Sequence, residues 1–254
     1  MILFNTDLDN TIIYSYKHDI GPEKRMVELY QGREISFISE ETFYLLQEAR
    51  SRLLMVPTTT RSIEQYERID LGLGAFPYAL ACNGGILLEN GRRNEAWYQD
   101  SLKLIAESEE VIKQSISLLE TEQRRYFEIR HIEKLFVFTK CREPEAVIEE
   151  LRRKLDTSLA DVFNNGDKIY VVPKSLNKGK ALLRLKTLLK ADRVLAAGDS
   201  EFDISMVEAA DLGLVPPGFK AKYGVEKASV KETPEQGLFS EELLKLCLEA
   251  CAEN

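Results

Sequence analysis

The sequence predicts an α/β protein with a Rossmann-like parallel sheet as its core and a smaller α+β domain inserted into that core. Near both ends of the chain, short apolar runs alternate with amphipathic stretches of helical period, which is typical of parallel sheets covered by helices. In the middle, two strand-like runs at 126–131 and 134–140 follow each other without a helix between them. Acidic residues follow the apolar runs at 1–5 and 193–197, where parallel sheets place their ligand sites.

The composition is that of a folded globular chain, with 254 residues of which 44% are hydrophobic. The formal charge of -8 disfavours binding to nucleic acid or anionic membranes, because the long-range field has the wrong sign. No apolar stretch approaches the roughly 20 residues that span a bilayer, and no signal-peptide pattern opens the chain. We therefore expect a cytoplasmic protein, as a monomer or homodimer. Only two histidines occur, His18 and His131, which disfavours a zinc site or a Ser-His arrangement.

The elements of the core follow from apolar runs and helical periods. Strands are expected over 1–5, 52–57, 78–82, 193–197 and 212–215. Helices are expected over 40–50, with Ser39 as N-cap, and over 62–71 and 178–189. The segment 19–37 is rich in charged and aromatic residues with little period, and it is either a flap beside the site or an irregular connection.

The middle of the chain has a different order of elements. We expect a helix over 101–120, strands over 126–131 and 134–140, a helix over 143–155, and strands over 160–163 and 168–172. This order suits a small antiparallel α+β module. We therefore predict a core domain formed by residues 1–91 and 173–254, interrupted by a cap domain over residues 92–172.

Two carboxylates follow the first predicted strand directly, in the run Asp7-Leu8-Asp9-Asn10-Thr11. Two acidic side chains at a strand end can share a hard divalent cation. A carboxylate in this place can also attack phosphorus and form an acyl-phosphate, which divides one difficult displacement into two easier ones. Because surface turns often contain Asp-x-Asp, this motif needs support from others.

Three further motifs are expected at the same edge of the sheet. Residues 58–61 read Thr-Thr-Thr-Arg, whose hydroxyls could hold a phosphate oxygen or simply cap a helix. Lys178 opens a helix and could pair with both a phosphate and a carboxylate. Asp199 follows Gly198 at a strand end, with Asp203 four residues later, and could complete an oxygen-ligated Mg²⁺ site or form an ordinary turn. Their convergence on one edge favours the functional interpretation of all four motifs.

With these motifs, the sequence resembles the haloacid dehalogenase-like phosphohydrolase superfamily. It resembles in particular the subclass with an α/β (C2B-type) cap after the third strand, which includes Cof-type and sucrose-phosphatase-like phosphatases. Asn83, in an Asn-Gly turn after residues 78–82, is similar to a turn of that subclass. The matching motif residues are Asp7, Asp9, Thr11, Thr59, Lys178, Gly198, Asp199 and Asp203.

The resemblance implies a phosphoric monoester hydrolase that acts on a small phosphorylated metabolite, such as a sugar phosphate. Asp7 would be the nucleophile that is phosphorylated, and Asp9 the general acid and then the base. The implied Mg²⁺ ligands are Asp7, Asp9 through its backbone carbonyl, Asp199 and, in support, Asp203. The implied ligands of phosphate and substrate are Thr11, Thr59, Thr60, Arg61, Asn83, Lys178 and, from the cap, His131. For His131, an ordinary position on the sheet surface is the alternative.

Three residues depart from the family pattern. Thr60 stands where glycine is common, which would make the loop that faces the substrate stiffer. Asn10 stands where glycine is usual, and asparagine tolerates the left-handed backbone that glycine would adopt. Phe202 stands where asparagine is usual, and a phenyl ring cannot replace its hydrogen bonds, so metal binding or turnover could be altered. Two alternatives remain open on the sequence: a phosphomutase of the phosphomannomutase type, and a module that binds a phosphorylated ligand without turnover. The natural substrate is not identified by the sequence.

Overall fold

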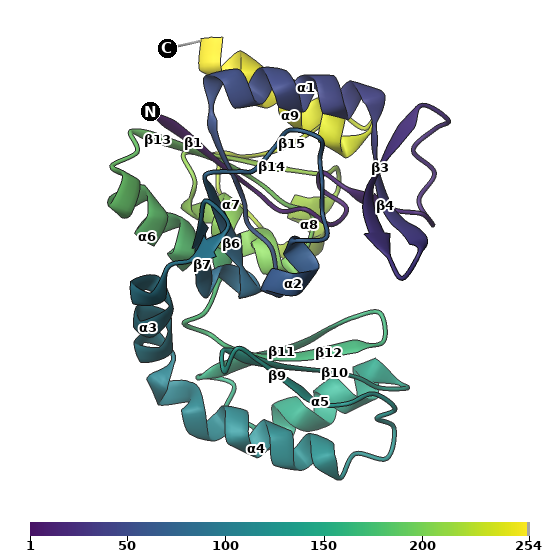
Figure 1. The fold of residues 1–254 in the computed structure, drawn as a ribbon. Coiled ribbons are helices and arrows are strands. Elements are labelled where there is room, and N and C mark those ends of the chain that lie inside the picture. The colour runs from purple at the N-terminus through teal and green to yellow at the C-terminus, as the bar shows by residue number, and fades with distance from the viewer. Residues whose placement is uncertain (253–254) are drawn as a thin grey trace. The chain divides into compact units, whose positions relative to one another are not determined.

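The structure is a computed structural model that describes residues 1–252, and the chain forms two compact units (Figure 1). The first unit consists of Met1–Arg93 together with the chain from Lys178 onwards, and the second unit is Asn94–Asn177. Among the described residues, no helix has the length and apolar character needed to cross a membrane.

A parallel sheet organises the first unit, with the strand order β15-β14-β13-β1-β5. Its strands are β1 (Ile2–Thr6), β5 (Leu54–Pro57), β13 (Arg193–Ala197), β14 (Leu212–Val215) and β15 (Val230–Glu232). The first four confirm predicted strands, whereas β15 was not predicted. Because β1 pairs in parallel with both β13 and β5, the carboxyl ends of these three strands lie at one edge of the sheet.

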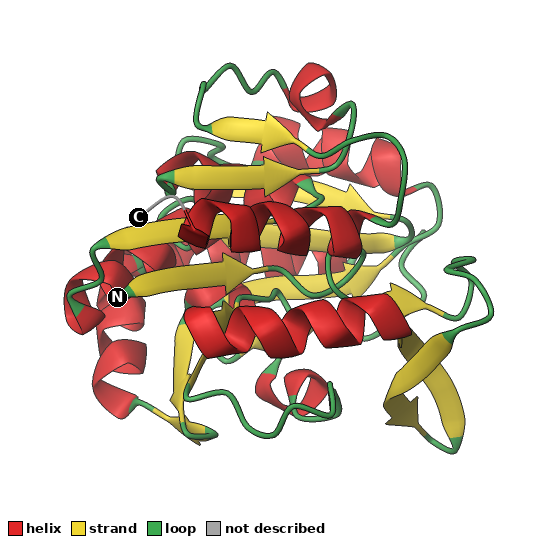
Figure 2. Cartoon of the chain, turned by 90° about the horizontal axis from the view of Figure 1, so that it is seen from above, coloured by secondary structure: helices red, strands yellow, loops and turns green. Residues whose placement is uncertain are grey.

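Helices cover both faces of this sheet. On one face, α1 (Glu40–Arg52) and α9 (Phe239–Ala252) lie side by side, as Figure 2 shows. The other face carries α7 (Ile204–Ala209), which packs on β13 and β14, and α6 (Lys178–Leu189), which packs on α7. The predicted N-cap of α1 is confirmed, because the Ser39 hydroxyl accepts a hydrogen bond from the Thr42 amide at 3.0 Å.

In the first unit one predicted helix is wrong, and a segment without a predicted element contains strands. The helix expected over 62–71 is wrong beyond its first turn, since α2 spans only Ile63–Tyr66 and the chain then turns through Gly72 and Gly74, both with positive φ. The segment 19–37, for which the sequence leaves two interpretations open, contains a hairpin of β3 (Lys24–Tyr30) and β4 (Arg33–Ser39), and β2 (Tyr14–Ser15) also pairs with β4. Its two-residue turn, with positive φ at both positions, is Gln31-Gly32, a weaker hairpin signal than Asn-Gly.

A smaller antiparallel sheet completes the first unit. It consists of β6 (Tyr78–Ala81), β7 (Ile86–Glu89) and β8 (Arg92–Arg93). A parallel bridge between Thr58 and Leu80 joins β6 to the chain just beyond β5. The strand predicted over 78–82 is therefore confirmed, and β7 and β8 were not predicted.

The second unit is an antiparallel sheet with helices, as predicted, and the fold class is confirmed. The sheet order is β11-β12-β10-β9. The helix expected over 101–120 is wrong as a single element: α3 ends at Leu104 and α4 begins at Glu109, and the Ser108 hydroxyl between them donates to the Leu159 carbonyl. The elements are α3 (Glu95–Leu104), α4 (Glu109–Glu120), β9 (Arg130–Ile132), β10 (Phe136–Lys140), α5 (Pro144–Lys154), β11 (Ala160–Asn165) and β12 (Lys168–Pro173).

The two faces of this sheet differ in character. One face packs on α4 and α5 through an aliphatic core that includes Val137, Val162 and Val171. Side chains alternate along a strand, so the neighbouring positions point to the opposite face. There Phe163 is in register with Tyr170, and Tyr170 with Phe138. We call Phe138, Phe163 and Tyr170 the aromatic row.

Candidate active site

Backbone hydrogen bonds hold the ends of the parallel strands together. The Asp7 amide donates to the Ala197 carbonyl at 2.9 Å, and the Thr58 amide donates to the Thr6 carbonyl at 2.7 Å. The segments that follow β1, β5 and β13 therefore start side by side. The turn after Asp9 places Asn10 at φ 60°, the left-handed conformation that asparagine tolerates.

Lys178 is the buried centre of the site. Its side chain is 1% exposed, and its Nζ lies 2.6 Å from an oxygen of Asp7 and 2.6 Å from an oxygen of Asp203. Gly179, the next residue, lets the start of α6 lie close to Ser205, because a Cβ at residue 179 would overlap the Ser205 backbone. Burial disfavours the ammonium charge, but the carboxylates of Asp203 and Asp7 outweigh it and raise the pKa of Lys178. The Lys178 ammonium therefore stays charged between them.

Three carboxylates from two distant parts of the chain gather beside Lys178. Asp7, Asp199 and Asp203 each place one oxygen within 4.8 Å of the others. The Thr11 hydroxyl lies between Asp7 and Asp199, at 3.3 Å and 3.4 Å. Because hard divalent cations prefer carboxylate oxygens, this set of donors fits such a cation.

Burial disfavours the ionised forms of two of these carboxylates, Asp7 and Asp199. It raises the pKa of Asp7 well above its usual range, against the effect of Lys178. Burial, reinforced by the charge of Asp203, raises the pKa of Asp199 to about 7. A bound cation would favour the ionised forms of both groups.

Asp203 is anchored within its own turn. One of its oxygens accepts hydrogen bonds from the Ser200 amide at 3.0 Å, the Ser200 hydroxyl at 2.8 Å and the Asp199 amide at 3.2 Å. Gly198 leaves room for this, because a Cβ at residue 198 would overlap the Asp203 side chain. With Lys178 on the other oxygen, Asp203 has its hydrogen bonds without a contribution from Phe202.

The carboxylate of Asp9 is bound by Arg61 and is not a member of the three-carboxylate group. Arg61 donates to its two oxygens at 2.8 Å and 2.6 Å. The same guanidinium donates to both oxygens of Glu28, at 2.9 Å and 3.0 Å. The sequence interpretation missed Glu28, and its only signal was an acidic residue beside the apolar pair Met26-Val27.

The remaining predicted phosphate ligands of the first unit lie next to Arg61 in the chain or in space. Thr59 is buried, and its hydroxyl accepts a hydrogen bond from the Arg61 amide at 3.1 Å. Asn83 is buried with φ 58°, and its backbone amide donates to the Thr59 carbonyl at 2.9 Å. Thr60, between Thr59 and Arg61, is partly exposed. His131 lies on β9 of the second unit, and its role stays a prediction.

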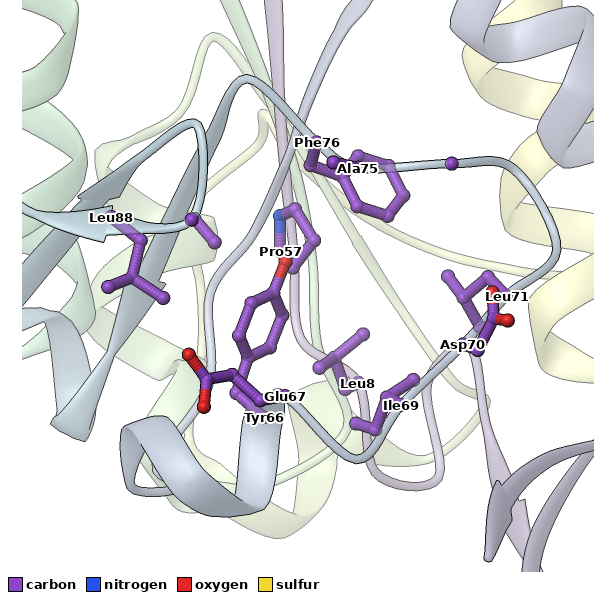
Figure 3. A pocket seen from close by; sticks show the side chains of 13 residues that line it. Leu8, Pro57, Tyr66, Glu67, Ile69, Asp70, Leu71, Ala75, Phe76 and Leu88 are labelled. Carbon is purple, nitrogen blue, oxygen red and sulfur yellow. The ribbon is translucent and has the colours of Figure 1, made fainter.

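A separate cavity of about 400 Å³ lies in the first unit. Figure 3 shows the Tyr66 ring between Leu88 on one side and Leu8 and Ile69 on the other. Burial raises the pKa of Tyr66 to about 12, so its phenol stays neutral. Of the residues around the first motif, only Leu8 lines this cavity. The carboxylates and Lys178, and not this cavity, therefore define the candidate active site.

A family comparison supports the resemblance based on the motifs. Residues 92–215 match the family described as haloacid dehalogenase-like hydrolase. The matched segment contains Lys178, Asp199 and Asp203, and it does not extend to Asp7 or Thr59. No curated protein matches the chain.

Solved structures agree with this match in their fold. The chain is similar to the sucrose-phosphatase from Synechocystis sp. PCC6803 in complex with sucrose and phosphate, with a TM-score of 0.70, 18% identity, and coverage of 98% of this chain and 97% of that chain. It is also similar to a Thermoplasma acidophilum protein (TM-score 0.61, 14% identity, 99% of each chain) and to a haloacid dehalogenase-like hydrolase from B. subtilis (TM-score 0.59, 16% identity, 96% of this chain and 99% of that chain). Such low identities establish the fold alone.

Proposed function

Starting from the resemblance to haloacid dehalogenase-like hydrolases, which the match of residues 92–215 and the similar fold support, we propose that this chain is a Mg²⁺-dependent phosphatase. It hydrolyses a small phosphorylated metabolite through an aspartyl-phosphate on Asp7. The observation that carries the proposal is the group of three carboxylates around one buried ammonium, that of Lys178. With all groups ionised, this arrangement has an excess of buried negative charge, which is costly in a purely structural ion pair. A divalent cation would balance it.

The mechanism assigns each residue of the first unit one task. Lys178 orients Asp7 and, with Thr59, binds the phosphoryl group, while Asp7 attacks phosphorus. Asp9 protonates the leaving oxygen and then accepts a proton from the water that hydrolyses the aspartyl-phosphate. Mg²⁺, held by Asp7, Asp199, Asp203 and the Asp9 carbonyl, would supply positive charge that offsets the repulsion between Asp7 and the phosphate dianion.

We also propose a sugar phosphate as the substrate class, with the second unit selecting it. The aromatic row presents three partly exposed rings, with centroids 5.3 Å apart for Phe138 and Tyr170 and 6.1 Å apart for Phe163 and Tyr170. Aromatic side chains are common where proteins bind small ligands, and flat rings can contact the apolar faces of a sugar. The similar sucrose-phosphatase was solved with sucrose and phosphate. We expect the reaction in the cytoplasm, on a monomer or homodimer.

A phosphate-release screen tests the proposed function. The purified chain is incubated with sugar phosphates, phosphoglycerates, nucleotides and phosphorylated cofactors, with Mg²⁺ or with a chelator. We expect release that requires Mg²⁺ and is fastest with a sugar phosphate. Slight net release from a sugar 1-phosphate with a bisphosphate activator, together with isomerisation of the sugar phosphate, would instead indicate a phosphomutase. The proposal would be overturned if no compound gave more phosphate release with the wild-type chain than with an Asp7→Asn variant.

The affinity for Mg²⁺ should rise with pH through the range in which Asp7 and Asp199 lose their protons. Since the pKa of Asp199 is about 7 in the metal-free chain, a proton must leave before the cation binds below that pH. Affinity should then fall by about tenfold or more for each pH unit below 7. Isothermal titration calorimetry between pH 5.5 and 8 measures this, and buffers of different ionisation enthalpy report the released proton.

The metal-free chain should show the opposite trend in stability. The folded-state pKa of Asp199 lies above its unfolded value, so the folded state binds more protons and the free energy of unfolding falls as pH rises from about 4 to 7. Asp199→Asn should weaken that slope, whereas Asp161→Asn, at an exposed position on β11, should leave it unchanged. A free energy of unfolding of the metal-free chain that does not fall over this pH range, measured by urea unfolding, would contradict this trend. A Mg²⁺ affinity that does not change between pH 5.5 and 8 would contradict the prediction for metal binding.

A further inference from the structure

We infer that Glu28, a buried carboxylate on the β3–β4 hairpin, is a positioning residue for Asp9 and acts through Arg61. This inference rests on the proposed function, in which Asp9 transfers protons. Glu28 lies 33 residues before Arg61 in the chain, and Arg61 donates to both carboxylates. The three side chains form a continuous series of hydrogen bonds from the hairpin to the first motif.

The hairpin is built to turn Glu28 inward. The pairing of β3 with β4 is irregular on both sides of Glu28, between Met26 and Glu28 and between Glu28 and Leu29. A bulge of this kind redirects a side chain that regular alternation would point the other way. As a result Val27 and Glu28, although adjacent in a strand, are both buried, and Glu28 is 1% exposed.

The Glu28 carboxylate is fixed by several hydrogen bonds, so it can in turn fix the position of the Arg61 guanidinium. Besides the two bonds from Arg61, its carboxylate accepts hydrogen bonds from Arg68 at 3.1 Å and from the Ser36 hydroxyl at 2.7 Å. Burial opposes ionisation of Glu28, but the hydrogen bonds and charge of Arg61 outweigh it and lower the pKa of Glu28. The carboxylate is therefore a fixed negative partner for the guanidinium.

Arg61 transfers this constraint to Asp9. A guanidinium is planar and rigid, so binding one of its edges to Glu28 fixes the direction of its other edge. The Arg61 side chain is 12% exposed, whereas that of Asp9 is 47% exposed, so the guanidinium is the more deeply buried partner of this pair. Proton transfer requires the carboxylate within hydrogen-bond distance of the reacting oxygen, so loss of this orientation lowers the rate.

A merely structural role explains this arrangement poorly. An apolar side chain at residue 28 would cost less than a buried carboxylate with its ion pairs, because pairing seldom exceeds the desolvation penalty. Arg25 of the hairpin forms another ion pair, with Glu40 at the start of α1, at 2.9 Å and with both side chains about one-third exposed. That pair does not include Asp9 or Arg61, which makes it a matched control.

The test compares Glu28→Gln with Glu40→Gln, alone and in an Asp9→Asn background. With the best substrate of the screen, Glu28→Gln should lower kcat by about tenfold or more and change KM by less than about threefold. Glu40→Gln should leave both unchanged. In the Asp9→Asn background, Glu28→Gln should have almost no further effect, because the group that it positions is already absent.

The outcomes separate this inference from the proposed function. A wild-type chain without phosphatase activity would overturn the proposed function. Equal loss from Glu28→Gln in both backgrounds, or no loss in a folded variant, would overturn the positioning role while leaving the phosphatase intact. Urea unfolding of the same variants does not depend on turnover: the effects of Glu28→Gln and Asp9→Asn on stability should be non-additive, and strict additivity would also overturn the role of Glu28.

Discussion

Asp7→Asn is expected to abolish phosphate release, with kcat reduced by about 10⁴-fold or more. The amide has nearly the same shape as the carboxylate, and its oxygen can still accept a hydrogen bond from Lys178, so the fold should be preserved. It cannot attack phosphorus, however, and no aspartyl-phosphate can form. The measurements are steady-state phosphate release and mass spectrometry of the chain after acid quench, in which the phosphorylated form should appear for the wild type alone.

Asp70→Asn is the control for this substitution. Asp70 caps an exposed turn by accepting a hydrogen bond from the Gly72 amide at 2.8 Å, outside the site, and its loss should leave kcat unchanged. Asp7→Asn should also bind inorganic phosphate at least as tightly as the wild type, because one negative charge beside the anion is removed. An Asp7→Asn activity within tenfold of the wild type would exclude Asp7 as the nucleophile.

The carboxylates and Lys178 could be predicted because each one follows, or lies close to, a locally recognisable element. Asp7 and Asp199 come after apolar runs that form β1 and β13, and these strands pair in parallel. Parallel strands must bring their carboxyl ends to one edge, so the convergence needed no knowledge of side-chain contacts. Lys178 at the first position of α6 followed in the same way.

Contacts that depend on tertiary packing could not be predicted. Glu28 becomes important only because a bulge turns it inward and because Arg61 lies beside it in the folded chain. The sequence of residues 19–37 has no periodicity that would indicate the bulge or the contact with Arg61. The break between α3 and α4 also depends on a distant contact, because the Ser108 hydroxyl donates to the carbonyl of Leu159, 51 residues later. The helical period of the sequence continues through this break and does not predict it.

Lys178→Met is expected to lower the free energy of unfolding of the metal-free chain by about 3–5 kcal/mol, because it leaves buried charge without its partner. Methionine fills a similar volume, so the change removes the ammonium from Asp7 and Asp203 more than it removes packing. Urea unfolding at pH 7 measures the loss. On the same helix, Lys186→Met breaks a half-exposed pair with Asp211 at 3.2 Å and should cost at most about 1 kcal/mol.

The pH dependence of this loss distinguishes charge from packing. Lowering the pH to 5 protonates Asp199, whose pKa is about 7, and favours the neutral form of Asp7. Less repulsion is then left for Lys178 to balance, so the penalty of Lys178→Met should shrink there. Millimolar Mg²⁺ at pH 7 should shrink it as well, since a bound cation stabilises the folded state. Activity should stay low in both conditions, because the phosphoryl group has lost its ammonium. An equal penalty at pH 5 and pH 8, with and without Mg²⁺, would mean that Lys178 stabilises the core by packing and that the three carboxylates do not need a counter-charge.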